Sequence, residues 1–230
     1  IDAITLAKMP FIDPERFDEL YLAPAQTHAL QRLIRQRKRL EDQITAHKKR
    51  IGALIDGYLP GVRQVFSHPG SVQVRAFLHS QVNPFAVVRD GEEALHTSLN
   101  QAKPQSKAGR AEGYLVYRAC QNVLALQQLC QAAGSLNEDF FVDLQDEIDR
   151  ELRLMEAEEA ETEALDQRIE ELYRKLHPSD NLRTIPGVGE HTAPVFAAGI
   201  GDPTRFPSQS EFANWTGVVP GAKQSSDVES

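Results

Sequence analysis

The sequence is poor in several features that mark particular classes of protein. Its 230 residues include two cysteines, Cys120 and Cys130, which have neither metal-ligand spacing nor the pattern of a disulfide framework. We expect both to be reduced, buried thiols in a cytoplasmic protein. No run of about 18 apolar residues occurs, so the sequence predicts no membrane-spanning helix and no membrane partner. The seven histidines are scattered and form no ligand cluster.

The chain also lacks an excess of positive charge. Its formal net charge is -8 and its pI is about 5.4. This balance excludes a uniformly basic coat for nucleic acid but leaves room for local basic patches. Internal repeats, low-complexity tracts and the alternating pattern of β-strands are missing as well, so we predict a mainly α-helical protein.

Two long stretches have the heptad spacing of a coiled coil. The first follows Pro24, meets no proline or glycine before Gly52, and has basic flanks. The second starts at Ser135 or Asn137, runs to about Leu176, and is strongly acidic. The first seam comprises Leu30, Leu33, Arg37, Leu40, Ile44, His47, Ile51 and Leu54, and the second comprises Phe140, Leu144, Ile148, Leu152, Met155, Leu165, Ile169, Leu172 and Leu176.

The opposite charges of these two helices predict that they pair as a long antiparallel coiled coil. Exposed charge pairs contribute about 0.2–1 kcal/mol each, so they select the partner more than they stabilise it. Two alternatives stay open at this stage. The basic helix could face DNA or RNA instead, or the coil could form between chains and produce a dimer or tetramer.

The segment between the long helices carries no sharp motif. We expect helices over Ser71–Val82, Asp90–Ala102 and Ala111–Ala132, and a loop that begins at Asn83-Pro84. In the third of these helices one face is expected to be buried, and it comprises Leu115, Ala119, Val123, Leu126 and Cys130.

A glycine hairpin, Ile185-Pro186-Gly187-Val188-Gly189, leads into an apolar helix expected over Thr192–Ile200. Both glycines allow a positive φ, and the start of the helix offers free N–H groups to a phosphate. This pattern is typical of a helix-hairpin-helix element, which grips the nucleic-acid backbone, although an ordinary helix–helix turn is an equal alternative. The candidate DNA contacts are Gly187, Gly189, His191 and Thr192, and the residues expected to be buried are Leu182, Ile185, Val188, Ala193, Val195, Phe196 and Ala197.

A second loop, Gly201-Asp202-Pro203-Thr204-Arg205-Phe206-Pro207, follows this helix. Asp202 has the position of a cap for the next turn, and Arg205 could hold a phosphate. An Asp–Arg pair within the loop is an equally good interpretation. Trp215 is expected in the core, with base stacking as the alternative.

Three pieces of the sequence occur together in a known family. They are the I-P-G-V-G-E-x-T-A hairpin, the segment G-D-P-x-R-F-P-S-x-x-x-F-A-x-W-x-G-V-V-P, and the terminal Gln224-Ser225-Ser226. In this order they resemble the C-terminal transposase domain of the Piv/MooV-type DNA invertases and insertion sequence 110 family transposases. Ile1-Asp2-Ala3 resembles the end of the last acidic motif of the RuvC-like nuclease domain in that family, which precedes a long coiled coil.

The resemblance implies a function and its residues. It implies an insertion-sequence transposase that cuts and rejoins DNA through a serine, with Ser225 as first candidate and Ser226 as second. It also implies a Mg²⁺ site of four carboxylates of which only Asp2 is present here, a structured guide RNA, a bacterial nucleoid-associated location and a homo-oligomer. Lys223 joins Arg205 as a candidate DNA contact.

The resemblance implies three parts: residues 1–23 as the tail of a RuvC-like nuclease domain, 24–177 as a coiled-coil and helical linker region, and 178–230 as a truncated, helix-hairpin-helix-like C-terminal transposase domain. The chain starts at Ile1 and ends without a cap, so we expect it to be part of a longer protein. We expect this part alone to lack strand-transfer activity. The competing hypothesis is a non-catalytic helical scaffold that serves DNA binding or dimerisation.

Overall fold

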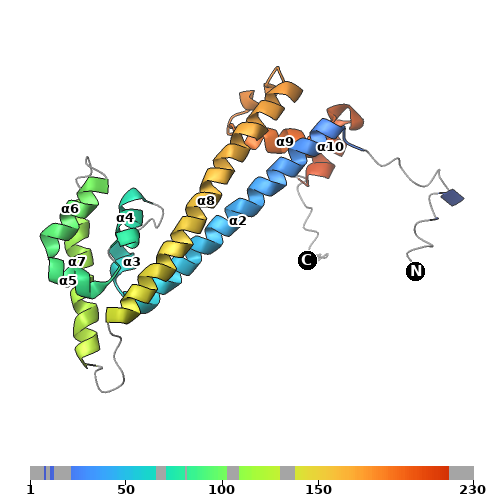
Figure 1. The fold of residues 1–230 in the computed structure, drawn as a ribbon. Helices are drawn as coiled ribbons and strands as arrows, with labels where there is room; N and C mark the ends of the chain where they lie inside the picture. The colour runs from blue at the N-terminus through green and yellow to red at the C-terminus, as the bar shows by residue number, and fades with distance from the viewer. Residues whose placement is uncertain are drawn as a thin grey trace, which may run out of the picture. The chain divides into compact units, whose positions relative to one another are not determined.

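The computed structural model describes residues 8, 11–12, 22–65, 71–80, 82–102, 109–129 and 138–217, and every regular element within these ranges is a helix (Figure 1). The chain divides into two compact units. The central unit is Arg35–Arg168, and the terminal unit combines Ile1–Ile34 with Ile169–Ser230. None of the helices in the described ranges is long and apolar enough to cross a bilayer.

Two long helices, α2 (Ala25–Tyr58) and α8 (Glu138–Leu176), contribute to both units. Between them in the central unit lie five shorter helices: α3 (Val62–Val65), α4 (Val72–Ser80), α5 (Pro84–Asp90), α6 (Glu92–Ala102) and α7 (Gly109–Leu129). The terminal unit adds the 3₁₀ turn η3 (Asn181–Thr184), α9 (Thr192–Ile200), the 3₁₀ turn η4 (Pro203–Arg205) and α10 (Gln209–Thr216).

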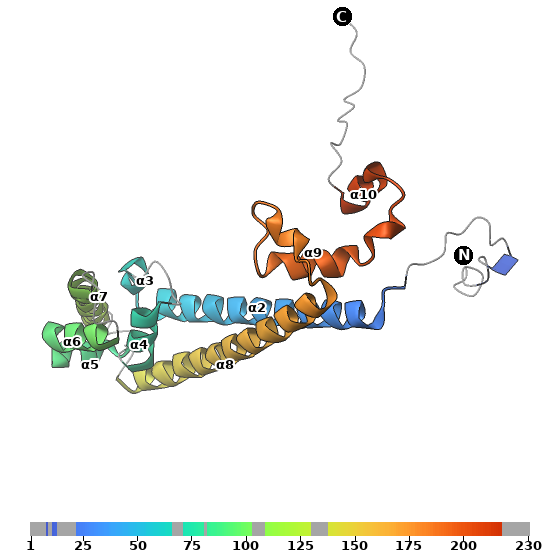
Figure 2. The same ribbon diagram turned by 90° about the horizontal axis from the view of Figure 1, so that it is seen from above.

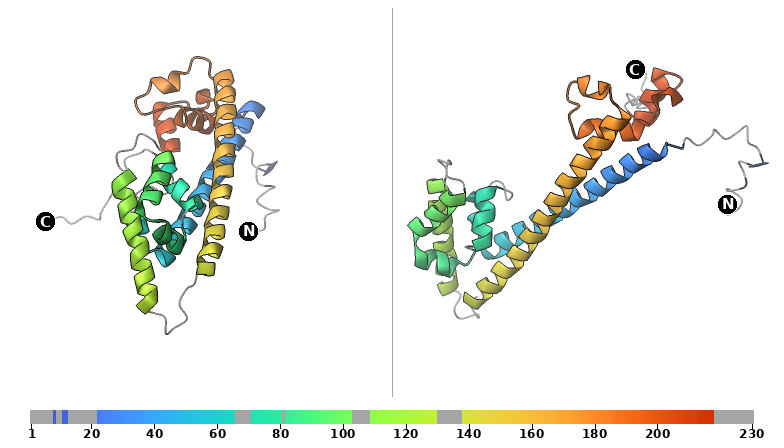
Figure 3. Two further views of the ribbon diagram at one scale, coloured as in Figure 1. Left: turned by 60° about the vertical axis from the view of Figure 1, so that its left-hand side comes forward. Right: turned by 45° about the horizontal axis from the view of Figure 1, so that its top comes forward.

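Within the central unit α2 and α8 lie side by side and run in opposite directions (Figures 1 and 3). Residue numbers on α8 fall as those on α2 rise in the ion pairs between the helices, which are Arg37 with Asp166, Lys48 with Glu159, and Arg50 with Glu151. The antiparallel pairing predicted from the opposite charges is therefore confirmed.

The predicted seams are confirmed in most positions. Ile44, Ile51, Leu144, Ile148, Leu152 and Met155 are all buried. The predicted seams missed Ile55, Phe141 and Tyr173, which are also buried. The 3.6-residue period of a helix drifts away from a strict heptad, so that Ile55 takes the place expected for the half-buried Leu54.

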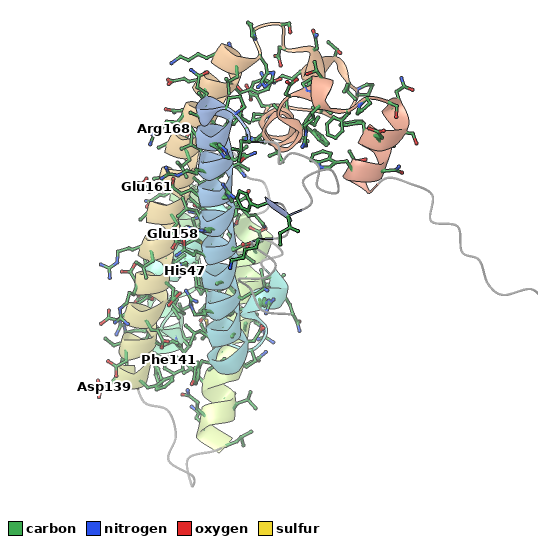
Figure 4. All side chains as sticks on the ribbon, turned by 90° about the vertical axis from the view of Figure 1, so that its right-hand side faces the viewer. His47, Asp139, Phe141, Glu158, Glu161 and Arg168 are labelled. Atoms are coloured by element: carbon green, nitrogen blue, oxygen red, sulfur yellow. The ribbon has the colours of Figure 1, made fainter. Side chains whose placement is uncertain are left out.

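His47 is, with Arg37, one of two polar positions in the predicted seam of α2 (Figure 4). Its side chain is 7% exposed and bridges two carboxylates one heptad apart on α8. Its Nδ1 lies 2.6 Å from Glu151 and its Nε2 lies 3.4 Å from Glu158. Hydrogen bonds from Arg50 and His47 outweigh the opposing effect of burial and hold the pKa of Glu151 below its usual value.

The five short helices pack into the core of the central unit. Phe77, Leu99, Val116 and Cys120 are completely buried there. Burial raises the pKa of the Cys120 thiol to about 12, so this cysteine is an inert core residue at neutral pH, as the sequence predicts. Cys130 lies outside the described residues.

The capping residues explain where two of these helices begin. Ser71 Oγ accepts a hydrogen bond from the Val74 amide at 3.3 Å and starts α4, as predicted. The loop expected at Asn83-Pro84 is wrong, because Asn83 Oδ1 accepts from the Phe85 amide at 2.9 Å and caps α5. Pro84 occupies the first turn of α5, where a missing N–H costs nothing.

The prediction for the buried face of α7 is only partly right. Ala119 and Val123 are buried, but Leu115 and Leu126 are half exposed. The face that reaches the core instead contains Val116 and Cys120, and it lies one residue further round the helix.

In the terminal unit α9 packs against the start of α2 and the end of α8. Leu30, Ile169 and Ala198 form a small buried cluster, with further leucine and isoleucine side chains of α2 and α8 around it. Gln31 Nε2 donates a hydrogen bond to the carbonyl of Ala198 at 2.8 Å. The C-terminal segment is thus held by both long helices through contacts inside one unit.

Candidate functional site

A network of polar side chains joins the end of α8 to the turn that precedes the glycine hairpin. The Tyr173 ring is fully buried, and its hydroxyl donates to Asp180 at 2.7 Å. Burial and this hydrogen bond raise the pKa of Tyr173 to about 12. Arg183 lies over the same ring, with 5.1 Å between its Cζ and the ring centroid, and pairs with Glu170. We call these four residues the Tyr173 network.

Asp180 allows the chain to reverse after α8. Its φ of 49° lies in the left-handed region, which Asp tolerates better than most residues other than glycine. The Asp180 carbonyl then accepts from the Arg183 amide at 3.2 Å, which forms the first turn of η3. A hydrogen bond from Arg183 holds the pKa of Glu170 below its usual value against the effect of burial. The hairpin therefore starts from a fixed point on α8.

The glycine hairpin itself is a single tight turn. The Val188 amide donates to the Ile185 carbonyl at 3.0 Å across Pro186 and Gly187. Gly187 has φ of 86°, and a proline followed by such a glycine is the pattern of a type II turn. Gly189 does not have a positive φ, so only one of the two glycines uses the conformational freedom that the sequence offers.

Gly189 has a different role, because its carbonyl caps the first turn of α9. It accepts from the Thr192 amide at 3.2 Å and from the Ala193 amide at 3.0 Å. Pro194 has no amide proton to offer. The expectation of free N–H groups is therefore wrong for Thr192 and Ala193, whose donors are used within the turn. The side chains of His191 and Thr192 are exposed beside it.

Helix α9 follows the hairpin in the terminal unit (Figure 2). It has one buried face and one exposed face. Ala193 and Ala197 are buried against Tyr173, with Leu182 and Val188 around them, as predicted. Burial of Val195, Phe196 and Ile185 was predicted wrongly, since these side chains are 49%, 48% and 50% exposed. Helical geometry explains the difference, because residues 193 and 197 are one turn apart and residues 195 and 196 point elsewhere.

The loop after α9 is organised by Asp202. Its Oδ1 accepts from the Thr204 amide at 2.9 Å and from the Thr204 hydroxyl at 2.7 Å, which caps η4. These hydrogen bonds from Thr204 lower the pKa of Asp202, with a smaller contribution from the charge of Arg205. The predicted capping role of Asp202 is confirmed.

Arg205 packs against aromatic rings. Its Cζ lies 4.4 Å from the ring centroid of Phe206 and 4.9 Å from that of Trp215. Phe212 completes the group, with its ring centroid 5.2 Å from that of Phe206. These cation–π contacts fix the guanidinium in one place on the surface of the terminal unit.

Trp215 belongs to this aromatic group without being a core residue. It is 47% exposed, and α9 accommodates it at Gly199, where a Cβ would lie 3.9 Å from the indole Cη2. Ser208 caps α10 by accepting from the Glu211 amide at 3.2 Å. The expectation of Trp215 as a core residue is therefore wrong.

The predicted site residues fall into two groups. Gly187, Gly189, His191 and Thr192 lie together at the start of α9, while Arg205 follows its other end. Asp2, Lys223, Ser225 and Ser226 lie outside the described residues. In the part of the chain that the structure describes, no three His, Cys, Asp or Glu side chains are grouped to hold a metal ion.

The Tyr173 network was not recognised from the sequence, which did contain a weak signal. Pro178 follows two residues after the end of α8, and Asp180 is a residue type that tolerates a left-handed backbone. These two features mark a chain reversal. They do not reveal that Glu170 and Arg183, thirteen residues apart, would meet across it.

Comparison with known proteins identifies this segment. A search of curated proteins and a search of solved structures gave no match. The family model described as Transposase IS116/IS110/IS902 family matches residues 179–230, which include the hairpin, α9, the Asp202 loop and α10. Residues 179–230 are therefore similar to the transposase domain of the IS116/IS110/IS902 family.

Proposed function

We propose that the protein is an insertion-sequence transposase that acts as a site-specific DNA recombinase. The match of residues 179–230 to a transposase family is the observation that carries the proposal. The ordered hairpin, α9 and the Arg205–aromatic group support it, because they offer fixed polar and aromatic groups beside a nucleic-acid backbone. We assign phosphate contacts to Gly187, Gly189, His191, Thr192, Arg205 and Lys223, in a module of helix-hairpin-helix type.

The proposed chemistry is a transesterification by a serine, with Ser225 preferred over Ser226 as the nucleophile. The Ser225 oxygen forms a bond to a DNA phosphorus while the bond from that phosphorus to one deoxyribose oxygen breaks. The serine proton passes to a general base, and the departing sugar oxygen takes up a proton. Because the number of phosphoester bonds is conserved, attack by a second DNA end can reverse the step and rejoin the strands.

Activation of the serine is assigned to a RuvC-like carboxylate site. Asp2 is the residue of this chain that would contribute to it, with Mg²⁺ as the cation that hard oxygen ligands prefer. Such a cation would neutralise charge on the phosphate. The proposal also includes a structured guide RNA, a dimer or tetramer formed through the coiled coil, and a nucleoid-associated location in a bacterial cytoplasm.

The parts of the chain have separate tasks in this proposal. Residues 1–23 would belong to the nuclease domain, 24–177 would form the coiled coil and its helical insertion, and 178–230 would form the transposase domain. The Tyr173 network would then hold the DNA-contacting turn on the coil.

A covalent-capture assay tests the proposal. The full-length gene product that carries this sequence is incubated with supercoiled DNA containing the element ends, with Mg²⁺, and adducts are resolved under denaturing conditions. We expect a protein–DNA adduct that disappears in Ser225→Ala, while Ser210→Ala, a change at an exposed serine of α10, retains it. Adduct formation that survives Ser225→Ala and Ser226→Ala together would refute the serine mechanism.

The second candidate is a non-catalytic scaffold that binds DNA or serves dimerisation. The observation in its favour is the large share of the described residues that belongs to a helical frame, in which α2 and α8 pair through an apolar seam and ion pairs. A scaffold would bind DNA equally well in the wild type and in Ser225→Ala and would give no adduct in either. The same assay therefore separates the two functions.

A further inference from the structure

We propose that the outward face of α2 in the central unit binds the phosphate backbone of nucleic acid through Arg35, Arg39 and Lys49. We call these three residues the α2 basic face. The proposal rests on the proposed function, because it adds a second contact for the same class of ligand. It concerns a surface that is remote in sequence from the transposase domain at residues 179–230.

The charges of α2 in this unit fall into two sets. Four cations already hold carboxylates: Arg37 pairs with Asp166, Lys38 with Asp42, Lys48 with Glu159, and Arg50 with Glu151. Two of these pairs have short N–O distances, 2.9 Å between Lys38 and Asp42 and 2.7 Å between Arg50 and Glu151. The hydrogen bonds that Arg37 donates to Asp166 raise the pKa of Arg37 above its usual value. These cations are neutralised within the fold.

The second set is the α2 basic face. All three of its side chains belong to exposed residues, and within the described parts of the chain none of them has a carboxylate within 4.0 Å. The carboxylates of α2 itself do not compensate them. Each already holds a cation, since Glu41 pairs with Arg37, Asp42 with Lys38, and Asp56 with Arg63. The face therefore presents uncompensated positive charge.

Helical geometry places the three cations on one side. Arg35 and Arg39 are one turn apart, and Lys49 follows Arg35 by fourteen residues, so all three fall within an arc of about 80°. At 1.5 Å per residue, Arg35 and Lys49 lie about 21 Å apart along the axis. Phosphates of one DNA strand are about 3.4 Å apart along the duplex, so the face spans about six of them.

The character of the surface favours nucleic acid over a protein partner. Between residues 35 and 57 every exposed residue of α2 is polar or charged, apart from Ala53 and Gly57. A protein interface needs apolar or aromatic anchors at its centre, and none is present here. Backbone phosphates need only cations held in a row, which a rigid helix supplies.

Charge segregation strengthens this preference. The exposed part of α8 in the same unit is acidic, with Asp143, Asp146, Glu147, Glu161 and Glu163 all exposed. In a chain of net charge -8, a polyanion is repelled by that helix and attracted by α2. A paired coil with one basic and one acidic edge therefore orients the polyanion along the basic edge.

A salt titration of binding tests the proposal. The full chain is measured by fluorescence anisotropy with a 30-bp mixed-sequence duplex and, separately, with an RNA hairpin. The test variant is Arg35→Gln/Arg39→Gln/Lys49→Gln. Its matched control, Arg118→Gln/Arg150→Gln/Arg168→Gln, removes three other cations of exposed residues that have no carboxylate partner among the described residues.

We expect the test variant to bind more weakly and to lower the slope of log K against log salt by about 0.9 per lost contact on a duplex, or about 2.7 in all. The control should keep the parent slope. A slope that decreases only with the RNA hairpin identifies RNA as the source of the phosphates. It still supports phosphate binding by the α2 basic face. Equal slopes for parent and test variant on both probes overturn the inference alone.

Two further outcomes distinguish this inference from the proposed function and from a contact between two copies of the chain. A parent chain that binds neither probe at low salt contradicts the proposed function as well. A test variant that keeps the parent slope but loses self-association in sedimentation overturns the phosphate assignment and identifies the acidic α8 of a second copy as the partner. Circular dichroism confirms that both variants keep the helical fold, which is expected because none of the substituted side chains is buried.

Discussion

Tyr173→Phe is the substitution that most directly tests how the transposase domain is attached to α8. It keeps a ring in a fully buried site and removes only the hydroxyl that donates to Asp180 at 2.7 Å. A hydrogen bond to a charged group contributes about 1.5–3 kcal/mol. Asp180 keeps 37% of its side chain exposed, and water can replace part of what is lost. We therefore expect the substitution to lower the free energy of unfolding of this region by about 1.5 kcal/mol.

Hydrogen exchange is the appropriate assay, because a protein with two compact units need not unfold in a single transition. The expected loss corresponds to about ten-fold faster exchange of the amides in η3 and α9, which pack on this ring. Amides of the central unit should keep their protection. Tyr114→Phe, a change at an exposed tyrosine of α7, serves as the control.

Alkaline pH gives an independent measure of the same contact. The pKa of Tyr173 is raised from its ordinary value of 10 to about 12, so its contribution to stability is complete below pH 10 and is lost as the pH rises towards 12. The wild type should therefore lose more protection in η3 and α9 over this range than Tyr173→Phe does. Parallel curves for the two proteins, or equal effects of Tyr114→Phe, would refute the reasoning.

Four other substitutions probe the helical frame and the transposase domain. His79 lies between two carboxylates of α8, and its hydrogen bonds with them raise its pKa against the effect of burial. The free energy of unfolding should therefore fall as the pH rises through that raised pKa. His79→Gln should flatten this pH dependence in urea titrations. Leu152→Ala removes a fully buried side chain of the coil and should cost about 2–5 kcal/mol. Gly199→Ala adds a methyl group at ordinary contact distance from Trp215 and should stabilise α9 by about 0.5–1 kcal/mol, whereas Gly201→Ala, at φ of 65°, should destabilise it. Hydrogen exchange in α9 checks both glycine changes, and equal signs for the two would contradict the assigned backbone conformations.

The long helices were predictable because their signals are local and repeated. Apolar residues at heptad spacing and opposite net charges specified both the elements and their antiparallel pairing. The short helices between them were less predictable. Asn83-Pro84 suits a loop or a helix start equally well, and only the hydrogen bond from the Phe85 amide to Asn83 decides between them. The buried face of α7 depends on which neighbours pack against it, which the sequence of α7 does not contain.

The C-terminal turn shows a similar division. Its residue types predicted the tight turn at Gly187 and the cap at Asp202, because each depends on conformational preferences of single residues. They did not predict that the Gly189 carbonyl would accept hydrogen bonds from the amides of Thr192 and Ala193. The exposure of Phe196 was also missed, since it depends on which side of α9 faces Tyr173.

Because the Cys120 thiol is buried, its reactivity reports local opening of the central unit. Alkylating reagents attack the thiolate, and a group that is fully buried with a pKa of about 12 offers almost none at neutral pH. Labelling at this position therefore requires the core around α7 to open. Pulsed alkylation followed by peptide mapping would time that opening without any introduced probe, and binding of nucleic acid to α2 should slow it in proportion to the fraction of chains occupied.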